Sequence, residues 1–381
     1  MSYLSPEELY ERFKNGVIDK ASIINHLTSY IESSEKEELR IKSCKILNKL
    51  KPRSVEVFEF LEHLFISDMN PQIKRSAVSL IINNYIDKAL EPLKWLIHQH
   101  MSLRIMLEIE KYLININAEK AKKLLAQLIA ELLKNDKDIV PQALCDHYSS
   151  LSLDNLINLN IQELIDIIFE LKYPAYITEV CKQHSCDEHS WYVIVGGHVS
   201  EIQFNGYEGN DLNEVALLYR LKHLEKVSFS QCGIKTIKDL GLNSLLHLKH
   251  LEFFDEAISE INGLEGCVNL KKLIFYNTGI SEISGLEGLT NLEELRIERN
   301  YLTEIKGLEG LYKLKILNLK SNRITEFKGC EDLESLVYLN LEDNQIERIH
   351  GLEYFQELKE VNLKANPIKE INKNRAFKII L

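Results

Sequence analysis

The stretch LEELRIERNYLTEI, residues 292–305, has leucine or isoleucine at positions 292, 295, 297, 302 and 305 and a single asparagine at position 300. The same pattern returns at a constant spacing along the chain, so that the first leucine recurs as Leu248, Leu270, Leu292, Leu314, Leu336 and Leu358. Two further apolar columns keep this spacing, from Leu251 to Val361 and from Phe253 to Leu363. A short period kept in several columns is typical of a solenoid, in which each repeat packs only on its neighbours.

Each repeat contains an L-x-L segment in which apolar and polar residues alternate, and this alternation predicts a strand. The leucines of such a strand point into the core, and the residues between them point outward. Successive repeats then place their strands parallel and side by side, about 4.8 Å apart. Glycines at the same spacing, from Gly263 to Gly351, let the backbone turn back tightly after each strand.

On these residues the sequence resembles the leucine-rich repeat family, in the 22-residue form shared by internalins and phosphatase-regulating leucine-rich-repeat proteins. The resemblance covers residues 198–371, about eight repeats. It implies an α/β solenoid whose parallel sheet is concave. It also implies a buried ladder of asparagines bonded to the backbone of neighbouring turns, namely Asn300, Asn322, Asn344 and Asn366. The early repeats depart from this ladder, because Cys232, Glu256 and Thr278 stand at the asparagine position.

Both ends of a solenoid need a cap, because a terminal repeat would otherwise expose its core. Residues 184–197 are interpreted as a junction and the start of an N-terminal hairpin cap. WYVIVGGHVSEIQF, residues 191–204, alternates on both sides of Gly196 and Gly197, which is typical of a β-hairpin. At the other end, NPIKEINKNRAFKIIL resembles the C-terminal cap of the phosphatase-regulator class, which implies a short helix over residues 372–381.

Residues 1–183 have apolar residues spaced by three or four, which predicts helices. The expected helices lie near residues 20–33, 35–50, 54–67, 71–85, 87–99, 102–115, 118–134, 138–149, 161–171 and 174–183. The stretch DMNPQIKRSA, residues 68–77, resembles the inter-helix turn of HEAT-like repeats, in which a proline starts the second helix. The chain is therefore predicted to be an α+β multidomain repeat protein, with a HEAT-like α-solenoid before the leucine-rich repeats. An unrelated helical bundle is the alternative for the first region.

The composition is ordinary for a globular protein, with 381 residues of which 45% are hydrophobic and 27% charged. The net charge of −11 argues against a nucleic-acid partner, which requires a concentrated basic face. The sequence contains neither the ~18 consecutive apolar residues of a membrane span nor the pattern of a secretory signal. The seven cysteines are scattered and odd in number, which favours reduced thiols over a disulfide framework. We therefore expect a cytoplasmic protein without a membrane partner.

One cluster carries metal-ligand residue types, and it consists of Cys181, His184, Cys186 and His189. Its spacing crowds four ligands into nine residues, unlike the two separated pairs of a zinc finger, so a polar joint between domains is favoured over a metal site. No Gly-rich phosphate loop and no G-x-S-x-G elbow is present. An acidic column, Glu265, Glu287, Glu309, Glu331 and Glu353, belongs to the G-L-E turn of the repeat. We therefore expect no enzyme activity and no cofactor.

The outward residues of the sheet are the remaining candidates for function, because the core does not determine them. Aromatic and apolar residues gather there at two spots, with an arginine between them, and this is the composition of binding hot spots. The predicted partner-binding residues are Phe254, Ile274, Tyr276, Arg296, Ile316 and Tyr338. The alternative is that these residues only shield the sheet or face the helical domain.

The sequence therefore predicts a non-catalytic scaffold or adaptor that binds a protein partner on the concave sheet. The family resemblance suggests one alternative, a regulatory subunit of an enzyme such as a phosphatase or a small GTPase. A metal-dependent sensor or enzyme that uses Cys181, His184, Cys186 and His189 is a second alternative. RNA binding, known for some leucine-rich-repeat proteins, is a third, and the acidic charge counts against it.

Overall fold

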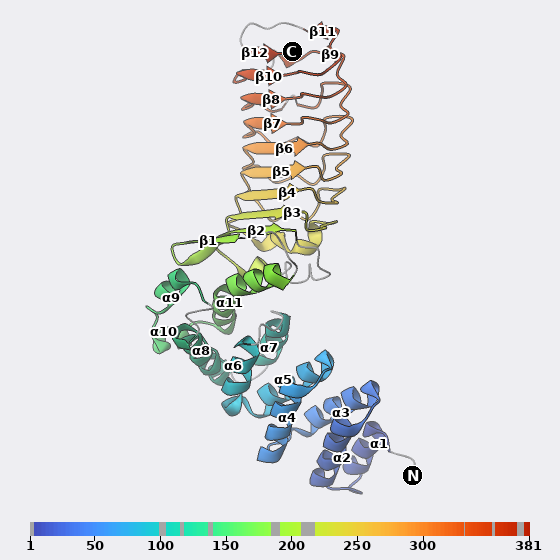
Figure 1. The fold of residues 1–381 in the computed structure, drawn as a ribbon, viewed down its shortest axis with the longest axis vertical. Coiled ribbons are helices and arrows are strands. Elements are labelled where there is room, and N and C mark those ends of the chain that lie inside the picture. Colours follow the sequence, from blue (N-terminus) through green and yellow to red (C-terminus); the bar gives the residue numbers. More distant parts are fainter. Residues whose placement is uncertain are drawn as a thin grey trace. The chain divides into compact units, whose positions relative to one another are not determined.

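The computed structural model describes residues 4–98, 104–114, 118–135, 140–183, 191–206, 218–330, 332–352, 355–371 and 377–381 (Figure 1). The chain divides into two compact units, Met1–Lys172 and Tyr173–Leu381. The order of elements confirms the prediction of a helical region followed by a parallel-sheet solenoid. None of the helices in the described part of the chain combines the length and the apolar character needed to span a bilayer.

The described residues before the first strand form eleven α-helices and one 3-10 helix. They are α1 (Pro6–Lys14), α2 (Lys20–Ser33), α3 (Glu37–Leu50), α4 (Val55–Ser67), α5 (Pro71–Asn84), η1 (Ile86–Lys88), α6 (Leu90–His98), α7 (Arg104–Ile114), α8 (Ala118–Asn135), α9 (Gln142–Tyr148), α10 (Leu153–Asn158) and α11 (Ile161–Gln183). Helix α2 packs on α3 and α4 packs on α5, while α5 also contacts α3 and α7. Neighbouring helices thus pack on one another, and their assignment as HEAT-like repeats stays a prediction.

The turn between α4 and α5 shows why the chain changes direction there. The side chain of Asn70 caps α5, because its Oδ1 accepts the N–H groups of Gln72 and Ile73 at 2.8 and 3.2 Å. Pro71 follows at the first helical position, where its missing N–H has no partner to lose. Asp68 accepts the N–H of Asn70 at 2.8 Å and forms an ion pair with Arg40 of α3, which ties this turn to the neighbouring helix pair.

Helix α11 corrects one expectation, because residues 161–171 and 174–183 form one continuous helix with Pro174 inside it. A proline inside a helix removes one backbone hydrogen bond and usually kinks or ends the helix. Four apolar side chains of the first half, Leu164, Ile165, Ile168 and Phe169, are at most 1% exposed. Their burial holds the helix in place, so we infer that packing offsets the lost bond. The sequence boundary between the two compact units falls inside this helix, because the helix ends at Gln183 and the first unit ends at Lys172.

The second unit is built on a ten-stranded sheet, in which only the first pair of strands is antiparallel (Figure 1). The strands in spatial order are β1 (Trp191–Val195), β2 (His198–Asn205), β3 (Lys226–Ser230), β4 (His250–Phe254), β5 (Lys272–Tyr276), β6 (Glu294–Glu298), β7 (Ile316–Asn318), β8 (Tyr338–Asn340), β10 (Glu360–Asn362) and β12 (Lys378–Ile380). Two short strands, β9 (Arg348–Ile349) and β11 (Glu370–Ile371), pair separately. Three 3-10 helices lie between early strands, η2 (Leu218–Arg220), η3 (Lys238–Leu240) and η4 (Leu242–Ser244).

The strand register follows the sequence period, so that Leu273 of β5 pairs with Leu295 of β6, the equivalent residue of the next repeat. The inward residues of four consecutive strands are phenylalanines whose rings stack with centroids 5.1 to 5.3 Å apart, namely Phe204, Phe229, Phe253 and Phe275. Aliphatic side chains continue this buried column from Ile297 onward. The core therefore runs unbroken along the solenoid.

Two backbone positions have positive φ in successive repeats, and they differ in the residues that they accept. At Gly307 (φ +74°) an added Cβ would lie 2.2 Å from the carbonyl oxygen of Ile283 in the preceding turn, so only glycine fits. The residue just before the asparagine ladder position is also left-handed in every repeat, with φ of 54° at Arg299 and 56° at Ser321. Non-glycine residues occupy this position from Gln231 to Ala365, at a modest conformational cost.

The structure agrees with the hairpin predicted at the N-terminal end of the repeats and differs from the helix predicted at the C-terminal end. Strands β1 and β2 form an antiparallel hairpin around Gly196 and Gly197, and β2 then pairs in parallel with β3. The helix expected over residues 372–381 is wrong for the described residues, because Lys378–Ile380 forms strand β12. Residues 372–376 lie outside the described part. Strand β12 pairs in parallel with β10, where Leu363 donates to the carbonyl of Ile380 at 2.7 Å. Two adjacent isoleucines favour a strand once such an edge is available.

A candidate interaction surface on the parallel sheet

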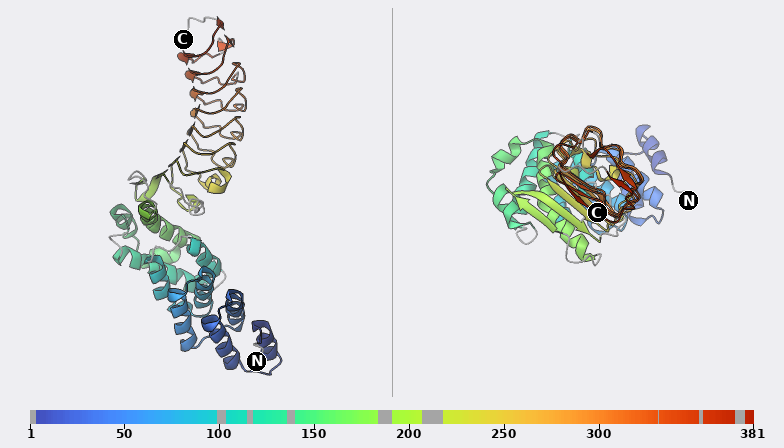
Figure 2. Two further views of the ribbon diagram at one scale, coloured as in Figure 1. Left: turned by 45° about the vertical axis from the view of Figure 1, so that its right-hand side comes forward. Right: turned by 90° about the horizontal axis from the view of Figure 1, so that it is seen from above.

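The parallel strands line the concave side of the repeat unit (Figure 2). The alternation along each strand gives three outward residues in each turn. The leading column contains Lys226, His250, Lys272, Glu294, Ile316, Tyr338 and Glu360. The central column contains Ser228, Glu252, Ile274, Arg296, Asn318, Asn340 and Asn362. The trailing column contains Ser230, Phe254, Tyr276, Glu298, Lys320, Glu342 and Lys364.

The first apolar spot is centred on Phe254 and Tyr276, which are register partners on β4 and β5. Their ring centroids lie 6.2 Å apart with the planes tilted by 45°, a favourable arrangement for two aromatic rings. The guanidinium carbon of Arg299 lies 5.4 Å from the centroid of the Tyr276 ring. Ile274 lies beside Tyr276 on the same strand, but it is only 8% exposed. Phe254 and Tyr276 are half-buried, so they provide most of the accessible surface of this spot.

The second apolar spot is formed by Ile316 and Tyr338, which are register partners on β7 and β8. Both side chains are half-buried. Arg296 lies on β6, between the two spots, and its Nε donates to Glu294 at 2.5 Å. The structure thus groups the predicted partner-binding residues into two pairs separated by a charged strand, with Arg296 already held by a neighbouring carboxylate.

Ion pairs connect most of the charged residues of this surface. Glu252 lies 3.6 Å from Lys226 and 3.3 Å from Lys272, so one carboxylate is shared by two lysines. Lys320 pairs with Glu342 at 3.0 Å, and this pairing lowers the pKa of the Glu342 carboxyl. Burial, followed by the repulsion of Lys272, lowers the pKa of His250, so its imidazole is neutral at pH 7. The surface is therefore close to electrically balanced.

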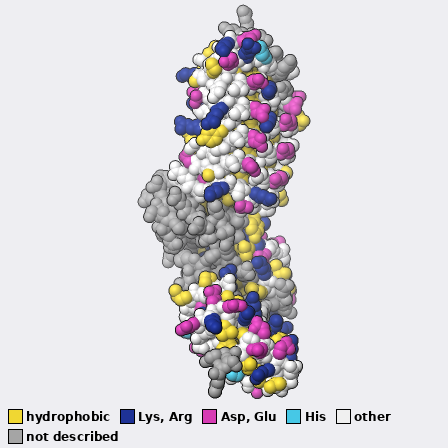
Figure 3. Space-filling view, turned by 90° about the vertical axis from the view of Figure 1, so that its right-hand side faces the viewer, with side chains coloured by type: hydrophobic (Ala, Val, Ile, Leu, Met, Phe, Trp, Pro, Cys, Tyr) yellow, Lys and Arg dark blue, Asp and Glu magenta, His cyan; other side chains and the backbone are white. Residues whose placement is uncertain are grey.

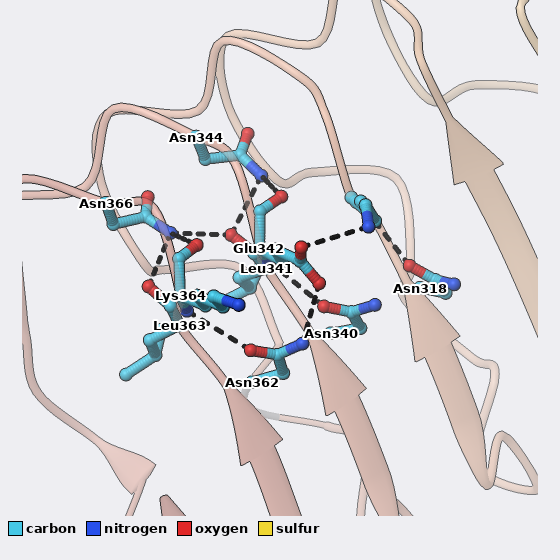
Figure 4. A network of polar contacts seen from close by, with 10 residues as sticks. Asn318, Asn340, Leu341, Glu342, Asn344, Asn362, Leu363, Lys364 and Asn366 are labelled. Carbon is cyan, nitrogen blue, oxygen red and sulfur yellow. Dashed lines mark hydrogen bonds and ion pairs between the residues drawn. The ribbon is translucent and has the colours of Figure 1, made fainter. Parts of the chain in front are cut away.

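A row of asparagines in the central column was not singled out from the sequence. In each case Oδ1 accepts the backbone N–H two residues later in the chain, just after the strand ends, at 3.1 Å for Asn318, 3.0 Å for Asn340 and 3.1 Å for Asn362 (Figure 4). Asn362 also donates to Glu342 at 2.9 Å. The signal was available, because these asparagines recur once per repeat, in L-N-L or V-N-L segments.

The ladder asparagines follow the strands, and three of them, Asn300, Asn322 and Asn344, are buried, whereas Asn366 in the last repeat is half-buried. Asn322 is 8% exposed, and its Nδ2 donates to the carbonyls of Ile297 at 2.7 Å and Leu319 at 2.9 Å. Its Oδ1 accepts the N–H of Leu302 at 3.1 Å. Asn300, Asn344 and Asn366 each bond in the same way to the preceding turn (Figure 4). These bonds join the backbone of each turn to that of the preceding turn, so the ladder holds neighbouring strands of the sheet in place.

Glu256 occupies the ladder position two turns before Asn300, and it bonds differently. Its carboxylate accepts the N–H groups of Cys232 and Ile234, both at 2.7 Å. It is only 5% exposed, and this burial raises the pKa of the carboxyl. An ionised carboxylate has no proton to donate, so it cannot bond to backbone carbonyls as the amide of Asn300 does.

The segments that return from one strand to the next are polar (Figure 3). Acidic side chains recur there along the repeats, and Glu265, Glu287 and Glu309 are all exposed. Lys306 pairs with Glu304 at 2.8 Å and Lys328 pairs with Glu326 at 2.8 Å. This acidic column is solvated, whereas Glu331 and Glu353 lie outside the described residues. The half-buried pairs of large apolar side chains, Phe254 with Tyr276 and Ile316 with Tyr338, lie on the concave sheet and not in these return segments.

The Cys/His cluster lies almost wholly outside the described residues. Cys181 belongs to α11 without a described side chain, and His184, Cys186 and His189 are not described. Elsewhere in the described chain, no three histidine, cysteine or acidic side chains are grouped so that they could hold a metal ion.

Comparison with known families bears on residues 268–346. The family model for Leucine rich repeat matches residues 290–346, and the model for Leucine Rich repeats (2 copies) matches residues 268–310. These are leucine-rich repeats. The matched residues include strands β5 to β8, and the same register extends through the neighbouring strands. Comparison with curated proteins gives no match to this sequence.

Solved structures that are similar to this chain include two internalins and a TLR13 complex. An internalin (inlF) from Listeria monocytogenes is 22% identical with a TM-score of 0.37, and the match covers 43% of this chain and 52% of that one. This chain therefore matches about half the length of that internalin. Internalin C2 from the same organism is 22% identical with a TM-score of 0.37, covering 62% and 94%. The TLR13–ssRNA13 complex is 22% identical with a TM-score of 0.42, covering 47% and 32%.

Proposed function

We propose that this chain is a non-catalytic scaffold or adaptor that binds another protein on the concave sheet of its leucine-rich repeats. The proposal rests above all on the two outward pairs, Phe254 with Tyr276 and Ile316 with Tyr338. These side chains are half-buried on a rigid sheet although the core does not require them. Large side chains held in this way lose little entropy on binding and commonly dominate the affinity of protein interfaces.

The ion pairing of the charged residues on the sheet supports a binding role rather than a catalytic one. The charged groups of the described strands are mostly engaged with one another, as in the pairs of Arg296 with Glu294 and of Lys320 with Glu342. A catalytic carboxylate or lysine usually needs an accessible position and a pKa close to neutral pH. Ion pairs of balanced charge around apolar spots are instead typical of a protein interface with an apolar centre and a polar rim.

We also propose that the protein acts in the cytoplasm. Five of its cysteines are buried, namely Cys44, Cys145, Cys232, Cys267 and Cys330. Burial raises the pKa of Cys44 to about 12 and that of Cys267 to about 11, so these thiols stay protonated and unreactive at neutral pH. Cysteines that are scattered along the chain and contribute to a core suit a reducing compartment.

The test is capture of a protein partner from native extract by the wild type and by the variants Tyr276→Ala and Tyr338→Ala. Truncating an interface anchor costs ~2 kcal/mol or more, so each variant should weaken the partner's affinity by roughly 30-fold. Tyr312→Ala is the matched control, because Tyr312 is 56% exposed in a turn outside the sheet. Undiminished capture by the double variant, with its melting temperature preserved, would place the binding site elsewhere.

A further inference from the structure

We propose that the trailing column receives a lysine or arginine side chain of the protein partner, held between the Phe254–Tyr276 pair and the Glu298 carboxylate. This inference rests on the proposed function, because it assumes that the partner lies on the concave sheet. It adds to the proposed function that the group bound at the first apolar spot is a basic side chain.

The three residues are adjacent in space. Phe254 pairs in register with Tyr276, and Tyr276 pairs in register with Glu298, on the consecutive strands β4, β5 and β6. Neighbouring strands lie about 4.8 Å apart, so a single side chain can reach both the rings and the carboxylate. The Arg299 guanidinium carbon lies 5.4 Å from the Tyr276 centroid, so the chain itself already places one cation over this ring.

Glu298 differs from the equivalent carboxylate two turns later. Glu342 also lies in the trailing column, and its carboxylate receives Lys320 Nζ at 3.0 Å and Asn362 Nδ2 at 2.9 Å (Figure 4). The nearest cation in an ion pair with Glu298 is Arg296, at 3.9 Å, and Arg296 is bonded more closely to Glu294 at 2.5 Å. The two side chains are similarly covered, with 19% and 24% exposure for Glu298 and Glu342.

The protonation behaviour agrees with this difference in pairing. Burial raises the pKa of the Glu298 carboxyl, and the charges of Arg296 and Lys320, a hydrogen bond with Asn318 and the charge of Arg299 oppose this only in part. The bond from Lys320 instead lowers the pKa of Glu342. Glu342 therefore has its counterion within the chain. Glu298 is a half-buried carboxylate that would gain more from an additional cation.

The leading column limits where a cation can approach. Lys226 and Lys272 share Glu252 at 3.6 and 3.3 Å, and Lys272 also lies 3.9 Å from Glu294, so the carboxylates nearest the leading column already have lysine counterions. A second basic group would be repelled there. On the same turns, the trailing column offers the two aromatic rings and, next along, Glu298. Cations are attracted to the faces of such rings and more strongly where water is partly excluded.

The experiment uses three small probes that differ at the side chain, N-acetyl-arginine amide, N-acetyl-lysine amide and the uncharged N-acetyl-norleucine amide. Each is titrated into the full chain carrying isotope-labelled tyrosine and phenylalanine, and the ring signals are followed by NMR. We expect saturable shifts of the Phe254 and Tyr276 signals with the basic probes and not with norleucine. Glu298→Gln should weaken the basic probes about fivefold, and Glu342→Gln should leave them unchanged.

The outcomes separate this inference from the proposed function. The inference is overturned if the basic probes cause no saturable shift in the wild type, or if Glu298→Gln and Glu342→Gln have equal effects. It is also overturned if the partner binds Glu298→Gln as tightly as the wild type while Tyr276→Ala and Tyr338→Ala lose binding, a result that leaves the proposed function intact. Full binding by both tyrosine variants would instead reject the proposed function.

Discussion

Replacing Asn322 by leucine tests the repeat register more sharply than any other single change. The leucine is close in size, but it can neither donate nor accept a hydrogen bond. It would leave the N–H of Leu302 and the carbonyl of Ile297 without their side-chain partner. Each buried group left unpaired costs ~1–3 kcal/mol, so the loss is about 2–6 kcal/mol for these two.

Ser321 provides the matched control, because it is the neighbouring residue on the same turn. Its φ of 56° is nearly that of Arg299, 54°, which occupies the equivalent position one repeat earlier. A long basic side chain is therefore compatible with this backbone, and Ser321→Lys should change stability by less than ~0.5 kcal/mol. The two substitutions are one residue apart but differ in predicted cost by at least about fourfold.

Urea denaturation followed by circular dichroism measures both variants. Because solenoid repeats need not unfold in a single step, the transition midpoint is compared along with the shape of the curve. We expect a clear loss for Asn322→Leu, concentrated in the part of the transition that reports on the repeats, and no shift for Ser321→Lys. Equal shifts for the two variants would refute the assignment of Asn322 to a buried ladder.

Three further predictions address the backbone and the buried carboxylate. Gly307→Ala should destabilise the repeats strongly, because the added Cβ would meet the carbonyl of Ile283 at 2.2 Å, and this is measured as a lower melting temperature. Ala365→Gly should stabilise them by about 1 kcal/mol, because alanine has a φ of 59° there, and a denaturation midpoint that does not rise would contradict this. Burial raises the pKa of Glu256 above 4.5, so its favourable contribution is fully present below that pH and is lost as the pH rises through the raised value. The stability of the wild type relative to Glu256→Gln should therefore increase as the pH falls, and a difference that decreases would contradict the burial argument.

The repeats were predictable from sequence because their period is set by residues that the core requires. Leu273 and Leu295 are both fully buried and lie one repeat apart, so the spacing alone fixes which residues pair. The hairpin at Gly196 and Gly197 follows from local turn chemistry in the same way. In both cases the sequence pattern that predicts the structure is local, because it involves only neighbouring repeats or a single turn.

Strand β12 and helix α11 were mispredicted because contacts distant in sequence decide them. Lys378–Ile380 is too short to carry a period of its own, and pairing with β10 selects the strand. Pro174 is a helix-breaking signal that the packing of α11 overrides.

The sequence predicts which residues form the candidate surface, but it does not predict which of its charged residues pair with one another. The alternation of the strands shows which residues point outward, yet it does not say which charges pair. The contrast between Glu298 and Glu342 depends on Lys320 bonding to one and not to the other. The period leaves outward residues unspecified, so their pairing becomes visible only in three dimensions.

The central claim, that a protein partner contacts the concave sheet, is tested most directly by site-specific photo-crosslinking. A benzophenone amino acid is placed at Tyr276, at Tyr338 or at the loop position Tyr312, and the chain is irradiated with the partner captured from native extract. The proposal predicts covalent adducts with the partner from the positions of Tyr276 and Tyr338 and none from that of Tyr312. Adducts formed only from the position of Tyr312 would contradict it.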